Sequence, residues 1–230
     1  MWTKERIAST IDHAVLKPLQ SKMDVLDECA MAHKWEIASV CIKPQHVILA
    51  QNYLTQFQSK VKVGTVINFP YGMDTTNVQQ EQAKQAILDG AGELDIVMNL
   101  ADFSAGNYGS VKSALKQTID YAKLHKDSIV TKVIFETCNL DKKQIIIACE
   151  IARDVEADFV KTSTGFGECG ASPSACLTML EEVEGIMGVK ASGGIKNLSD
   201  LLFYLTLGCT RIGTSSTDAI LKELEGDKDD

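Results

Sequence analysis

The sequence lacks any apolar run long enough to cross a membrane. A membrane-spanning helix needs roughly 18 consecutive apolar residues, and no stretch of the 230 residues approaches that length. The opening segment, MWTKERIASTIDHAVL, also lacks the apolar core and small-residue cleavage site of a secretory signal. We therefore expect a cytoplasmic protein with no membrane partner.

Paired cysteine motifs are missing as well. The seven cysteines are scattered, without a CxxC pair and without histidines or cysteines at the spacing of zinc ligands. In a reducing compartment such cysteines are free and mostly buried thiols. We predict no disulfide, no metal site and no cofactor. For Cys41 we expect a buried thiol, with a reactive thiol near the site as the alternative.

Basic clusters are also absent. The net charge is −8 and the lysines are dispersed, which argues against a surface for nucleic acid. The partner is expected to be a small molecule. If that molecule is anionic, local backbone N–H groups and a few lysines must overcome the unfavourable overall charge.

No linker interrupts the chain, and short β-rich runs alternate with helical segments. The runs are STIDHAVL (9–16), IASVCIK (37–43), VGTVIN (63–68), ELDIVMN (93–99), VTKVIFE (130–136), FVKTST (159–164), GVKASG (188–193) and RIGTSS (211–216). Eight such units predict a single α/β domain over residues 1–230, a (β/α)₈ TIM barrel. A doubly wound open sheet is the alternative. From about residue 225 we expect a short acidic tail.

Several of these strands contain charged residues. Outward positions in an all-parallel sheet pack against helices, so a charge must point into the barrel or lie at its C-terminal mouth. The residues concerned are Asp12, Asp95, Lys132, Glu136, Lys161, Lys190 and Arg211.

Crowded lysines have a chemical consequence. A desolvated lysine beside another cation favours its neutral form, which is the nucleophile that makes Schiff bases with carbonyl compounds. An aspartate within reach can then move protons. The alternative is a structural ion-pair cluster that only neutralises the barrel interior.

Glycine-rich segments follow the last strands. Loops seven and eight of this fold, together with a helix N-terminus, commonly bind phosphate. Our phosphate candidates are Gly193, Gly194, Gly213, Ser215 and Ser216. Taken singly, each glycine is better explained by a tight turn, and only their joint position indicates a phosphate site.

Seven segments together resemble the deoxyribose-phosphate aldolases, from about Ile11 to Ser216. They are IDHAVLKP, VGTVINFPYG, GELDIVMNL, VIFETCNL, FVKTSTGFG, VKASGGI and RIGTSS. The resemblance implies a metal-independent class I aldolase on a (β/α)₈ barrel. It cleaves 2-deoxy-D-ribose 5-phosphate to acetaldehyde and D-glyceraldehyde 3-phosphate, in deoxyribonucleotide catabolism, and is expected to be a homodimer.

The resemblance also implies roles for individual residues. Lys161 would form the Schiff base, Lys190 would lower its pKa and join the proton relay, and Asp95 would complete the relay. Asp12 would help to hold the substrate. The further substrate-binding candidates are Lys132, Thr162 and Gly165, besides the phosphate residues given above.

The chain departs from the family pattern in a few places. Lys43 stands where asparagine is frequent, which leaves substrate contacts at the mouth open. Phe166 follows KTSTG, so the basic residue of some members is missing there. Two other functions remain possible at this point: another Schiff-base aldolase or transaldolase, or a phosphosugar-binding barrel without catalysis. Acetaldehyde formation from deoxyribose 5-phosphate separates all three.

Overall fold

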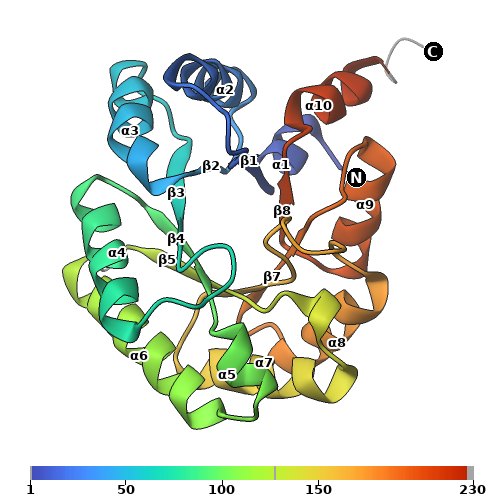
Figure 1. Cartoon of the computed structure of the whole chain (residues 1–230). Coiled ribbons are helices and arrows are strands. Elements are labelled where there is room, and N and C mark those ends of the chain that lie inside the picture. The colour runs from blue at the N-terminus through green and yellow to red at the C-terminus, as the bar shows by residue number, and fades with distance from the viewer. Residues whose placement is uncertain (1, 127, 227–230) are drawn as a thin grey trace.

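Eight parallel strands close into a barrel surrounded by helices (Figure 1). The computed structural model describes residues 2–126 and 128–226. The strands are β1 (Ile11–Val15), β2 (Ser39–Ile42), β3 (Lys62–Ile67), β4 (Glu93–Val97), β5 (Val130–Ile134), β6 (Phe159–Lys161), β7 (Gly188–Ser192) and β8 (Arg211–Thr214). The order runs from β1 to β8, and β8 pairs with β1. The predicted barrel is confirmed, and the open sheet is excluded.

Helices surround the barrel; the first precedes β1, the last follows β8, and the others connect successive strands. They are α1 (Lys4–Ala8), α2 (Lys22–Trp35), α3 (Val47–Gln56), α4 (Thr76–Leu88), α5 (Leu100–Ser104), α6 (Tyr108–His125), α7 (Lys142–Asp154), α8 (Pro173–Val183), α9 (Leu198–Leu207) and α10 (Thr217–Gly226). Two 3₁₀ turns, η1 (Pro44–His46) and η2 (Thr137–Asn139), follow β2 and β5. None of the described helices is long and apolar enough to cross a membrane.

Local sequence signals explain where helices begin. Ser21 and Asp141 each accept a hydrogen bond from the backbone N–H three residues later, and the side chain at that later position accepts one in return. These capping boxes satisfy backbone N–H groups that have no partner within the helix. At the other end of the chain, α10 continues to Gly226, next to the point from which the acidic tail is predicted. The remainder of that tail lies outside the described residues.

The alternation of side chains along each strand separates two environments. Outward residues such as Ile96, Val133 and Val160 are fully buried in one apolar cluster against the helices. Inward residues include the charged side chains, and the strand register sets Asp95 beside Lys132 and Lys161 beside Lys190. The fold thereby places lysines and carboxylates together inside the barrel.

Candidate active site

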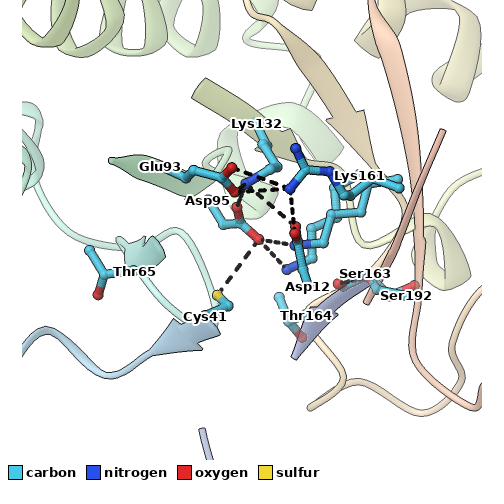
Figure 2. Close-up of polar contacts among 12 residues, drawn as sticks. Asp12, Cys41, Thr65, Glu93, Asp95, Lys132, Lys161, Ser163, Thr164 and Ser192 are labelled. Atoms are coloured by element: carbon cyan, nitrogen blue, oxygen red, sulfur yellow. Dashed lines mark hydrogen bonds and ion pairs between the residues drawn. The ribbon is translucent and has the colours of Figure 1, made fainter. Parts of the chain in front are cut away.

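Asp95 lies at the centre of the barrel and contacts three ammonium groups (Figure 2). Its Oδ2 atom is 2.7 Å from Lys161 Nζ and 2.7 Å from Lys190 Nζ, and its Oδ1 atom is 2.9 Å from Lys132 Nζ. All four side chains are almost completely buried. One carboxylate of β4 thus holds lysines from β5, β6 and β7.

Two further carboxylates complete the ionic network. Asp12 Oδ2 lies 2.6 Å from Lys190 Nζ, and Glu93 Oε2 lies 2.6 Å from Lys132 Nζ. Arg211 Nη1 bridges these acids, at 2.5 Å from Asp12 Oδ1 and 3.2 Å from Glu93 Oε1. The network is continuous from the strand-start residues Glu93 and Arg211 to the lysine at the end of β6.

The charges of this network do not balance if every group is ionised. Four cationic side chains, Lys132, Lys161, Lys190 and Arg211, meet three carboxylates, Asp12, Glu93 and Asp95. Among the described residues Lys161 pairs with one carboxylate, whereas the other three cations each pair with two or more. Lys161 is therefore the amine whose proton is least stabilised.

The directions of the pKa shifts agree with this charge count. Burial lowers the pKa of Lys161; Asp95 opposes that effect and Lys190 adds to it. Burial also disfavours the charged form of Lys190, but the carboxylates of Asp12 and Asp95 outweigh it and raise the pKa of Lys190. Neighbouring lysines hold the pKa of Asp95 well below its usual range despite its burial. An amine with a lowered pKa and an amine with a raised pKa thus contact the same carboxylate.

Burial, and not Lys190, is the larger cause of the lowered pKa of Lys161. From the sequence we expect both desolvation and a neighbouring cation to favour the neutral form, and both act in this direction in the structure. Lys190 remains a second cause of the same sign. Because both of their nitrogens contact the same oxygen of Asp95, the two amines are close neighbours.

A cavity of about 350 Å³ opens above the two lysines at the C-terminal end of the barrel. Lys161 and Lys190 form part of its wall, and glycine-rich loops form its rim. Gly193 and Gly194 have φ angles of +85° and +83°, in the left-handed region that favours glycine. Other lining residues are Asp12, Thr164, Gly165, Lys17, Lys196, Gly213, Thr214 and Ser215.

Hydrogen bonds hold the rim loops in place. The hydroxyl of Thr214 donates to Ile195 O at 2.7 Å and accepts from Ser216 N at 3.0 Å, which joins the loops after β7 and β8. On the other side, the Glu136 carboxylate accepts from both the backbone N–H and the hydroxyl of Thr164. The loop after β6 is thereby tied to the end of β5.

A family model described as DeoC/LacD family aldolase matches residues 6–207. The chain belongs to this family. A deoxyribose-phosphate aldolase of Thermococcus gammatolerans is 42% identical over 210 residues, which cover 91% of this chain and 92% of the relative. One from Clostridium perfringens (strain SM101 / Type A) is 43% identical over 217 residues, covering 94% and 95%.

A solved structure has a similar fold. The deoxyribose phosphate aldolase from Aeropyrum pernix, described as a unique tetramer, superposes with a TM-score of 0.89. It is 29% identical, and the match covers 97% of this chain and 92% of that one. The sequence resemblance to this aldolase family is confirmed.

Most of the predicted aldolase residues come together, but some do not line the cavity. Asp95 lies beneath the wall, under the two lysines that it contacts. Lys132 is 1% exposed and directed to Glu93 and Asp95, so this geometry does not support its predicted contact with substrate. The same applies to Thr162, a buried residue whose hydroxyl donates to Ser192 O. Ser216 lies just outside the lining, and its N–H is already bonded.

Three contributors to the site are not predicted from the sequence: Glu93, Lys17 and Lys196. Glu93 pairs with Lys132 and Arg211, yet it was not counted among the charged strand residues. The two-residue period of a strand puts it on the same face as Asp95, so this signal was available. Lys17 and Lys196, exposed at the cavity rim, carried no comparable signal.

Two residues that were left open are now placed. Cys41 is buried, lies 3.8 Å from Asp95 Oδ2, and has its pKa raised to about 11 by burial and by that carboxylate. This favours the buried protonated thiol over the reactive one. Lys43 donates to Pro18 O at 3.0 Å and lines a neighbouring groove next to Phe166, not the cavity above the two lysines.

Proposed function

We propose that this protein is a class I aldolase that cleaves 2-deoxy-D-ribose 5-phosphate to acetaldehyde and D-glyceraldehyde 3-phosphate, in deoxyribonucleotide catabolism. The observation that carries the proposal is the pair of buried amines on one aspartate oxygen, with Lys161 and Lys190 each 2.7 Å from Asp95 Oδ2. One amine has a lowered pKa and the other a raised pKa. We infer the substrate from the names of the relatives, which are deoxyribose-phosphate aldolases.

Lys161 is the nucleophile. Its neutral amine adds to the C1 aldehyde of the open-chain sugar, and loss of water from the carbinolamine gives an iminium ion. That cation accepts the electron pair of the C2–C3 bond as the C3 hydroxyl loses its proton and D-glyceraldehyde 3-phosphate departs. Protonation of the resulting enamine and addition of water then release acetaldehyde and restore the amine.

Asp95 and Lys190 control proton transfer in this scheme. Because Asp95 lies under the cavity wall, we propose that it exchanges protons with the C3 hydroxyl and the enamine carbon through a water molecule. Lys190 stays charged between Asp95 and Asp12, and its cation favours the neutral form of Lys161. Asp12 has two roles in this proposal: it orients Lys190, and it lines the cavity where the sugar binds. Lys132 sets the position of Asp95 from below.

The rim binds the phosphate group. Gly193, Gly194, Gly213 and Ser215 line the cavity together with Gly165, and we propose that their backbone N–H groups bind the phosphate. Lys196 and Lys17 supply positive charge there, which compensates for the basic residue that Phe166 replaces. Such a combination of N–H groups and cations suits a phosphate dianion. We further propose that the protein is cytoplasmic and forms a homodimer. Light scattering on the purified protein would measure the oligomeric state.

Borohydride trapping tests the function and the nucleophile together. The protein is reduced with borohydride in the presence of deoxyribose 5-phosphate, and the modified peptide is identified by mass spectrometry. We expect an adduct on Lys161 in the wild type and its loss in Lys161→Met, while Lys196→Met, which removes a lysine of the same cavity, keeps it. An adduct on another lysine, or an active enzyme without any adduct, would contradict the assignment. Release of acetaldehyde separates this reaction from that of a transaldolase.

A further inference from the structure

We propose that His13, held between Glu28 and Thr217, is a positioning residue that fixes the start of α10 for recognition of the substrate phosphate. The inference rests on the proposed function, because it concerns the phosphate end of the same cavity. His13 lies outside the ionic network. Its neighbour in β1, Asp12, points into the barrel, so His13 points outward toward the helices.

Both ring nitrogens of His13 have hydrogen-bond partners. Its Nδ1 atom is 2.8 Å from Thr217 Oγ1, and its Nε2 atom is 2.9 Å from Glu28 Oε2. His13 is 2% exposed and Thr217 is completely buried. A hydroxyl in such a place loses a full hydrogen bond when its partner is removed, because water does not reach it to substitute.

The chemistry of Glu28 sets the direction of its bond with His13. The bond with His13 lowers the pKa of Glu28, which keeps this residue a carboxylate and therefore an acceptor. Nε2 of His13 consequently carries a proton and donates it to Glu28. The other ring nitrogen, Nδ1, is hydrogen-bonded to the hydroxyl of Thr217. Glu28 thus fixes the orientation of the ring that holds Thr217.

Thr217 lies at the start of α10, next to the rim of the cavity. It is the first residue of α10, where Ser216 O accepts the first helical bond from Ile220 N at 3.0 Å. Ser215, two residues before it, lines the cavity. The segment from 213 to 217 is therefore anchored at both ends, by Thr214 to the loop after β7 and by Thr217 to β1 and α2. A shift of the α10 start moves the N–H groups at the rim but leaves Lys161, Lys190 and Asp95 in place.

This separation makes the proposal testable with two substrates. Thr217→Val removes the hydroxyl at constant shape, and Thr217→Ser keeps it. With deoxyribose 5-phosphate we expect Thr217→Val to raise KM about tenfold, the loss of one buried hydrogen bond, with kcat nearly unchanged. With unphosphorylated 2-deoxyribose kcat/KM should stay at the wild-type value. Thr217→Ser should restore the low KM.

A second variant covers the case in which Thr217→Val does not fold. Glu28→Ala affects a half-buried side chain, frees the ring of His13, and should raise KM for the phosphorylated substrate alone, by a smaller factor. If either variant lowers kcat/KM equally for both substrates, or changes neither, while the wild type cleaves deoxyribose 5-phosphate normally, only this inference is overturned. If the wild type does not cleave that substrate, the proposed function fails and the inference falls with it.

Discussion

Replacing Lys190 with leucine removes one of the two cations on Asp95 Oδ2 and tests the electrostatic account of Lys161. Both nitrogens lie 2.7 Å from that oxygen, so they are at most twice that distance apart. Two unit charges about 5 Å apart interact by roughly 3 kcal/mol at an effective dielectric constant near 20. This energy corresponds to a shift of about two pKa units. The pKa of Lys161 should rise by that amount, because the repulsion from Lys190 is removed. Asp95 also loses a competing partner, which acts in the same direction.

Trapping of the Schiff base reports this shift without requiring turnover. The rate of borohydride-trapped adduct formation at Lys161 is measured against pH with acetaldehyde as the carbonyl compound. Because only the neutral amine reacts, the rise of the rate with pH should move about two units higher in Lys190→Leu. Lys196→Met is the matched control, since it removes a cavity lysine outside the ionic network, and its profile should stay unchanged. An unmoved profile in Lys190→Leu would refute the role of Lys190.

Two other predictions concern stability and packing. The free energy of unfolding should depend on pH through Asp12 and Asp95, because neighbouring cations lower the pKa values of these residues in the folded protein. The stabilisation by these carboxylates is present above about pH 4, the pKa of an aspartate in the unfolded chain, and is lost as the pH falls toward the folded values. Urea unfolding should show this decline, and a constant free energy of unfolding between about pH 4 and 2 would contradict it. Gly213→Ala should lower kcat/KM and cost about 1–3 kcal/mol of stability, because its Cβ would lie 2.7 Å from Ser192 Cβ and 3.2 Å from Lys190 Cε. Gly109→Ala, which meets nothing within 4 Å, is the matched control for thermal melting and should be neutral or stabilising.

Strand-level features of this protein could be predicted from the sequence because they depend on local patterns. The eight β-rich runs, and the rule that charges within them face inward, were sufficient to bring Asp95, Lys161 and Lys190 together. The resemblance to known aldolases then gave them roles. The contacts of Asp95 with Lys161 and Lys190 follow from the same alternation of side chains.

Features that depend on distances between segments could not be predicted. The positions of Lys132 and Thr162 away from the cavity, and the tie between Glu136 and Thr164, depend on strand stagger and loop paths. The larger weight of burial in the pKa of Lys161 is likewise a property of the closed barrel. Charged neighbours can be identified from a sequence, but the degree to which the folded barrel excludes water from them cannot.

The pairing of β8 with β1 has a consequence for the order in which this protein is assembled during synthesis. Asp12 is made early in the chain, but Arg211, one of its partners, belongs to the last strand, and Asp12 aligns with Gly213 in the closing register. A ribosome-bound chain that still lacks β8 therefore has two unpaired sheet edges, and Asp12 beside one of them lacks one of its cationic partners. We expect the binding cavity to form as the last step of folding, so a chain released before residue 211 would be both inactive and prone to self-association.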